Sequence, residues 1–244
     1  MAFYRAEPAM QEHLVGLIDH FADQGRPGLH EQIAVNWVRY DQANLSTGSG
    51  FGAAWADQKP LYPASVVKLV YAVAVEAWLQ KGLLLETAEL RRAVNDMIAI
   101  SSNDATGLVV DCLTGTSSGP DLQGEAWVSW QRQRQLVNEW LSDFGWGEFE
   151  RVNCCQKTWG DGPYGREQRF YGENNCNRNA LTTASVSRLL EAVMTDGLLS
   201  PPACHRLRSA LARSLDQGER DADPENQVDG FLGEGLPANS RLWS

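Results

Sequence analysis

A serine and a lysine three positions apart are the residues of this chain best suited to chemistry. Ser65 and Lys68 lie in an apolar stretch, and Lys68 is the only charged residue from Ala64 to Val75. Residues three apart share one face of a helix, so the hydroxyl and the amine can meet. An amine buried among apolar side chains has a lowered pKa and can accept the serine proton. The pair therefore predicts a serine nucleophile with a lysine base.

A second polar cluster, Ser101-Ser102-Asn103-Asp104, separates two apolar helical segments. In one interpretation it only begins the next helix, because Ser, Asn and Asp are the preferred N-cap residues. In the other, Ser101 passes a proton to a leaving group and Asn103 hydrogen-bonds a substrate amide. The residues alone leave both interpretations open.

Composition and charge exclude several classes of function. A net charge of −10 with no basic patch argues against a nucleic-acid partner. No apolar segment is long enough for a membrane span, and no signal peptide is visible, so we expect a cytoplasmic protein, or a periplasmic or secreted one if the true start lies upstream. The five cysteines and four histidines match no metal spacing, so we expect no metal site. The glycines at 48–52 lead into a strand rather than a helix, and we expect no cofactor.

Hydrophobic periodicity predicts a short sheet followed by many helices. A helix is expected over 9–24, and strands over 33–40 and 51–56 form a hairpin. The helix that carries Lys68 should end near Lys81, before Gly82. A long irregular stretch is expected at 145–179. Further helices are predicted near 86–99, 104–114, 126–143, 182–196 and 202–214, which makes the fold class α+β.

The order of these motifs resembles the serine penicillin-recognising enzymes, specifically the class A β-lactamases. Phe51 to Lys68 is similar to the family's strand, turn and Ser-x-x-Lys segment, and Met97 to Thr106 is similar to its Met-Ile-x-x-Ser-Asp-Asn-x-Ala segment. Asn179 to Ala184, followed by an apolar helix, resembles the Thr-Thr-Pro helix after the family's Ω-loop. The resemblance extends over about residues 10–244 and is most specific at Ser65, Lys68, Ser101 and Asn103.

For the fold, the resemblance implies an α/β sandwich joined to an all-α lobe. Residues 1–60 would supply the first helix and hairpin of the sandwich, and 61–214 the helical lobe with an Ω-like loop at about 145–180. Residues 215–244 would return to the sandwich, with Leu242 and Trp243 beginning an inner strand. The family's Lys-Thr/Ser-Gly motif would follow Ser244, so we expect a chain truncated before its C-terminal strands and inactive as a fragment.

For the site, the resemblance makes Ser65 the acylated nucleophile and Lys68 its proton partner. Ser101 would protonate the departing nitrogen, and Asn103 would bind the acyl side chain. Ser102 stands where the family has an aspartate. The glutamate that deacylates the family's enzymes has no clean counterpart: Glu167 lies near the expected distance, and Glu173 fits the local pattern only loosely.

The function implied is hydrolysis of β-lactam amide bonds. The partner would then be a small molecule, either a β-lactam or an acyl-D-Ala-D-Ala-like substrate. A DD-peptidase or penicillin-binding activity and a cytosolic amidohydrolase are alternatives on the same scaffold. A non-catalytic binding module is the alternative from another class.

Overall fold

The computed structural model describes residues 3–244, apart from the side chains of Gln42 and Leu232. The chain is a mixed α+β protein, rich in helices and with small sheets, as the sequence predicts. It divides into two compact units, which are described separately here. One comprises Met1–Pro63, Asn138–Asn153 and Asn179–Leu198, and the other Ala64–Val137, Cys154–Arg178 and Leu199–Ser244.

The first unit contains a three-stranded sheet in the order β1-β3-β2. The predicted hairpin is confirmed: β2 (Val35–Arg39) pairs antiparallel with β3 (Phe51–Trp55). The strand β1 (Arg5–Ala6) adds to β3 in parallel. The sequence does not predict it, because two residues are too few to show an alternating pattern.

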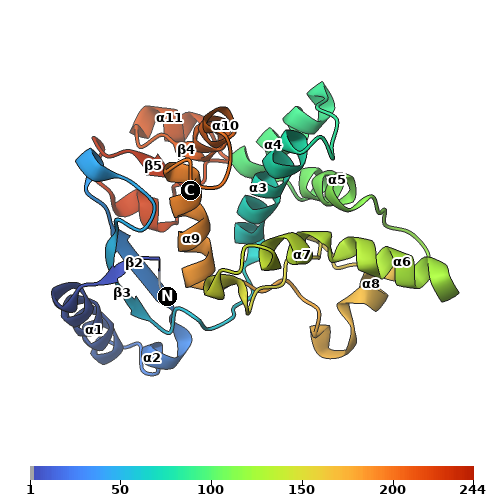
Figure 1. Cartoon of the computed structure of the whole chain (residues 1–244). Helices are drawn as coiled ribbons and strands as arrows, with labels where there is room; N and C mark the ends of the chain where they lie inside the picture. The colour runs from blue at the N-terminus through green and yellow to red at the C-terminus, as the bar shows by residue number, and fades with distance from the viewer. Residues whose placement is uncertain (1–2) are drawn as a thin grey trace. The chain divides into compact units, whose positions relative to one another are not determined.

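Helices cover this sheet on either side. The helix α1 (Pro8–Asp23) packs against β3 through Met10, Leu14 and Ile18, which are spaced four apart and therefore share one face. The helix α9 (Thr183–Met194) packs against β2, so the hairpin lies between α1 and α9 (Figure 1). Short helices α2 (Leu29–Gln32), η1 (Gln42–Asn44) and η3 (Gly147–Phe149) complete the unit.

The second unit is built around the helix that carries Lys68. A 3₁₀ turn, η2 (Ala64–Val66), leads into α3 (Val67–Gln80), where every residue from Val67 to Trp78 is buried. The helices α4 (Ala88–Ala99), α5 (Asn103–Thr114) and α10 (Pro201–Leu211) pack against it (Figure 1). Neighbours on several sides explain why α3 is apolar around its circumference.

The rest of the chain departs from the sequence prediction in detail. The helix predicted over 126–143 is two helices, α6 (Gly124–Arg134) and α7 (Leu136–Ser142). The stretch at 145–179 is not structureless, because η3, α8 (Arg166–Tyr171) and η4 (Glu173–Asn175) lie within it. Residues 138–153 and α9 fall within the range that the resemblance assigns to the helical lobe, and in the structure they cluster with the hairpin.

After α10 the chain forms a second, two-stranded sheet. The strand β4 (Ala212–Arg213) pairs antiparallel with β5 (Leu242–Trp243), at the two residues predicted to begin a strand. Between them lie the short helices α11 (Gln217–Ala222) and η5 (Leu232–Gly235). Within residues 3–244, no helix combines the length and the apolar character that a membrane crossing requires.

Candidate active site

Three polar side chains of the second unit meet at the start of α3. Ser65 lies in the η2 turn and Lys68 in the first turn of α3, and Lys68 Nζ is 3.1 Å from Ser65 Oγ. The same Nζ is 2.9 Å from Ser101 Oγ, which donates a 2.9 Å hydrogen bond to Ser65 Oγ. Each of the three groups therefore contacts the other two, and a proton can move between any pair.

Two further contacts fix the orientation of the amine. Lys68 Nζ donates to the backbone carbonyl of Ser101 at 2.5 Å and to Asn103 Oδ1 at 3.0 Å. Carbonyl oxygens only accept hydrogen bonds, so these two contacts take both hydrogens of a neutral amine. Its lone pair is then left toward the hydroxyls of Ser65 and Ser101. The contacts thus suit a lysine that acts as a base.

The environment of Lys68 favours this neutral form. Its side chain is 2% exposed, and no carboxylate among residues 3–244 forms an ion pair with it. Burial disfavours the charged form and lowers the pKa of Lys68 to about 8. Ser65, in contrast, is exposed. The serine hydroxyl is therefore accessible, while the amine beside it is kept from water.

The backbone is strained on both sides of this group. Ala64, immediately before Ser65, has a φ of 46°, and Ser101 has a φ of 56°. This left-handed region is uncommon for residues other than glycine, and each such residue costs about 1–3 kcal/mol. Such strain persists where the surroundings fix it, as at functional sites. Here it turns the chain so that Ser65 and Ser101 face each other.

The residues of the 101–104 cluster lie in two different settings, and only the capping interpretation is confirmed, for Ser102. Ser102 is the N-cap of α5, where its hydroxyl accepts a 3.2 Å hydrogen bond from the backbone N–H of Ala105. Ser101 and Asn103 join Lys68. Serine and aspartate cap helices about equally well, so the serine at 102 still fulfils a capping role.

Glu167 does not join the group formed by Ser65, Lys68 and Ser101. Its carboxylate, fully buried in α8, accepts hydrogen bonds from Arg134 Nη2 at 3.0 Å and from Ser118 Oγ at 2.8 Å. Within the described part of the chain, it forms no hydrogen bond or ion pair with Ser65 or Lys68. The geometry therefore does not support the deacylating role expected of it. Glu173, the looser alternative, is exposed in η4.

Glu167 belongs instead to a buried cluster of matched charges that sequence reasoning missed. Arg134 is fully buried and stacks over the ring of Trp130, 5.0 Å from its centroid. Lys157 lies 3.7 Å from Glu167 and binds Asp111 at 2.6 Å. The sequence holds one signal of this cluster: Trp127, Trp130 and Arg134 follow helical spacing and share one face of α6. Within the described residues, no group of His, Cys, Asp or Glu could hold a metal ion.

A comparison with protein families shows which family the chain belongs to. Residues 85–220, more than half of the chain, match the model of the beta-lactamase enzyme family, and the chain belongs to that family. The matched range includes Ser101 and Asn103 but begins after Lys68. No curated protein matches significantly.

Solved structures show the same fold at low identity. A point mutant of PBP-A, solved as an acyl-enzyme complex with penicillin G, matches with a TM-score of 0.53 and 14% identity, over 85% of this chain and 69% of that one. A beta-lactamase from Sphaerobacter thermophilus matches with a TM-score of 0.54 and 16% identity, over 91% of this chain and 74% of that one. A class A beta-lactamase representative from Bacteroides cellulosilyticus matches with a TM-score of 0.55 and 15% identity, over 94% of this chain and 74% of that one.

Proposed function

We propose that this protein is a serine hydrolase of the β-lactamase and penicillin-binding type, acylated on Ser65 by a β-lactam or an acyl-D-Ala-D-Ala-like amide. One observation carries the proposal. Lys68 is buried without an ionic partner among the described residues, and its Nζ lies 3.1 Å from the hydroxyl of the exposed Ser65. A buried amine next to an accessible hydroxyl is the arrangement of an activated nucleophile.

Acylation would proceed through the three groups that meet at Lys68. The neutral amine takes the proton of Ser65 as Ser65 Oγ attacks the amide carbon. The bond from that carbon to nitrogen then breaks, and Ser101 gives its proton to the departing nitrogen. Lys68 returns the first proton to Ser101 over the 2.9 Å between them, so both residues end as they began. Asn103, whose Oδ1 accepts a hydrogen bond from Lys68, would bind the acyl side chain.

The fate of the acyl-enzyme separates two functions, and one observation favours the second. A β-lactamase hydrolyses the acyl-serine rapidly and needs a base to activate water. Glu167, the carboxylate expected to do so, is occupied by Arg134 and Ser118. A penicillin-binding activity with a long-lived adduct therefore fits the site better than rapid β-lactam hydrolysis.

Covalent labelling tests the proposal directly. The full-length protein is incubated with a fluorescent penicillin, and the labelled peptide is mapped by mass spectrometry. We expect one adduct, on Ser65. Ser65→Ala should abolish it, and Ser102→Ala, which changes the neighbouring capping serine, should retain it. A folded protein that forms no Ser65 adduct would instead support a non-catalytic binding module. Rapid release of the adduct with nitrocefin turnover would favour the β-lactamase.

A further inference from the structure

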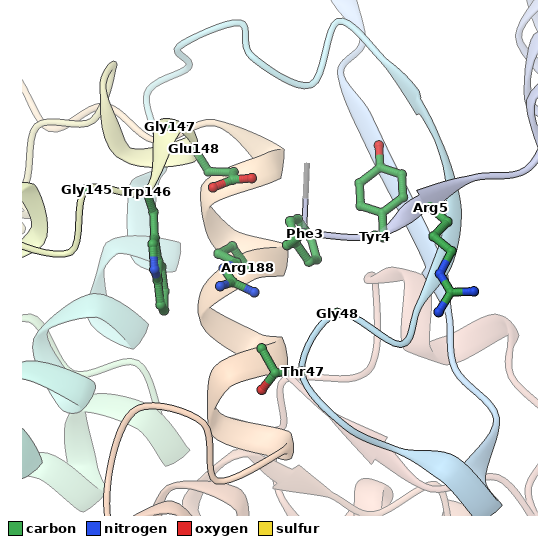
Figure 2. Close-up of a pocket in the computed structure, with 10 residues that line it drawn as sticks. All are labelled: Phe3, Tyr4, Arg5, Thr47, Gly48, Gly145, Trp146, Gly147, Glu148 and Arg188. Atoms are coloured by element: carbon green, nitrogen blue, oxygen red, sulfur yellow. The ribbon is translucent and has the colours of Figure 1, made fainter. Parts of the chain in front are cut away.

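A pocket in the first unit lies outside the candidate active site and has no assigned role. It has a volume of about 340 Å³ and is lined by residues 3–5, residues 47–48, the segment 145–148 and the helix α9 (Figure 2). Phe3, Tyr4 and Trp146 give it aromatic walls, and Glu148 and Arg188 give it two opposite charges. Pockets that hold small organic molecules begin at about 300 Å³ and combine apolar walls with a few polar groups.

Glu148 supplies a carboxylate that has no hydrogen-bond partner among residues 3–244. The residue as a whole is only 8% exposed. Figure 2 shows its side chain directed from η3 into the space between Trp146 and Phe3. Neither carboxylate oxygen is among the fully buried atoms without a partner, so the group faces the pocket and can be reached by a ligand. A ligand that donates hydrogen bonds to this carboxylate would gain charge-assisted contacts, which are the stronger ones in proteins.

Arg188 supplies a guanidinium with part of its hydrogen-bonding capacity unused. One terminal nitrogen pairs with Glu191, and the guanidinium stacks on Trp146 at 4.1 Å from the ring centroid. Its Nη2 forms no hydrogen bond with the described residues and is not fully buried, so it can meet a ligand, whereas the Nε is fully buried and out of reach. Glu191 is in turn held by the hydroxyl of Tyr40 at 3.2 Å and the backbone N–H of Gly48 at 2.8 Å. These contacts hold the guanidinium in place in the pocket wall.

The two charges line one pocket without pairing with each other. No ion pair between Glu148 and Arg188 forms within the described residues, although opposite charges in one cavity attract strongly. Arg5, at the same pocket, has an aromatic contact to Phe51 and adds positive charge on the side away from Glu148 (Figure 2). A dipolar ligand would satisfy both ends, whereas a simple cation or a simple anion would satisfy one.

We propose that this pocket binds a small zwitterion of the amino-acid type with an apolar side chain. Its ammonium group would donate to Glu148, its carboxylate would lie toward Arg188, and its side chain would contact the aromatic walls. Hydrogen bonds to charged groups are the stronger ones in proteins, which suits recognition by two such contacts. The site is independent of acylation at Ser65.

Three probes with one carbon skeleton test this assignment. Binding of phenylalanine, phenethylamine and 3-phenylpropanoate to the full-length protein is measured by calorimetry and by ligand-observed NMR. Phenylalanine, in at least one of its enantiomers, should bind at millimolar concentration or below. Each of the other two lacks one charged group and should bind at least about tenfold more weakly, the effect of losing one charge-assisted hydrogen bond.

Glu148→Gln is the deciding variant, because it keeps the shape of the side chain and removes its charge. This variant should bind phenylalanine about tenfold more weakly, or weaker still, and its affinity for 3-phenylpropanoate should be unchanged. Glu150→Gln, which changes an exposed carboxylate two residues away, should bind as the wild type does. Unchanged penicillin labelling of both variants checks that they are folded. The proposal is overturned if phenylalanine fails to bind the wild type, if all three probes bind alike, or if Glu148→Gln binds phenylalanine unchanged.

Discussion

Two buried sites of the second unit differ in whether their ionisable group has a partner of opposite charge. At the start of α3, Lys68 is buried among hydroxyl and carbonyl groups with no carboxylate partner in the described residues. In the cluster around α8, Glu167 is equally buried but is matched by Arg134, with Lys157 nearby. The matched charges compensate one another, whereas the unmatched lysine has its pKa lowered to about 8. The difference separates a group that can exchange a proton from one that holds the fold together.

The first prediction contrasts the two buried lysines and carries the largest effect. Lys68→Met should slow acylation of Ser65 about a thousandfold, because the serine loses its base. Its free energy of unfolding should stay within about 1 kcal/mol of the wild type or rise, since an unmatched buried amine is replaced by an apolar side chain of similar size. Labelling rates and urea unfolding measure the two quantities.

Lys157→Met is the matched control. Lys157 is nearly as buried but is paired with Asp111, so its loss should destabilise the fold and leave the labelling rate nearly unchanged. Equal effects of the two substitutions on labelling would remove the distinction between the sites.

The second prediction breaks the matched cluster. Arg134→Met leaves the carboxylate of Glu167 buried without its main partner, and the free energy of unfolding should fall by about 3–5 kcal/mol. Adding Glu167→Leu should recover most of that loss, because the orphaned charge is then removed as well. Urea unfolding of the single and double variants checks both values. A single variant as stable as the wild type would show that the cluster does not hold the fold.

The third prediction addresses the role first expected of Glu167. Glu167→Gln keeps the shape of the side chain and should cost about 2 kcal/mol of unfolding free energy through the lost ionic hydrogen bonds. The lifetime of the penicillin adduct should change by less than about threefold, since a carboxylate bound to Arg134 does not activate water. An adduct that lasts about a hundredfold longer in this variant would restore Glu167 as the deacylating base.

The fourth prediction has the smallest effect and separates capping from catalysis within one cluster. Ser102→Ala should cost about 1 kcal/mol of unfolding free energy through loss of the N-cap hydrogen bond to Ala105. Ser102→Asp should cost nothing, because an acidic cap also suits a helix N-terminus. Thermal unfolding measures both. A loss of labelling in either variant beyond the loss of folded protein would assign Ser102 a catalytic role.

Much of the site could be predicted from the sequence because its elements are local and strongly patterned. The spacing of Ser65 and Lys68, and the apolar residues around them, indicate a buried lysine on one helix face without any knowledge of tertiary structure. The long helices and the hairpin follow from periodicity in the same way. Ser101 and Asn103 needed the resemblance to a family, because a polar cluster between helices is equally typical of a cap.

The remainder depends on long-range contacts that no local pattern reveals. Arg134 and Glu167 are 33 positions apart, and their pairing is what places the Glu167 carboxylate in the charge cluster. The strand β1 is defined only by its pairing with β3. The positive φ of Ala64 and of Ser101 is fixed by the packing around the turn and is not expected from alanine or serine.

The pH dependence of acylation tests the central claim, that Ser65 is activated by a neutral Lys68. The second-order rate constant for penicillin labelling reports the pKa of the free protein's base. Because only the neutral amine accepts a proton, the rate should rise about tenfold per pH unit below about pH 8 and level off above it, with an apparent pKa of about 8. Lys68→Met should remove the transition. A rate that rises only near pH 4, as a carboxylate titrates, and is then constant through pH 8 would contradict the account.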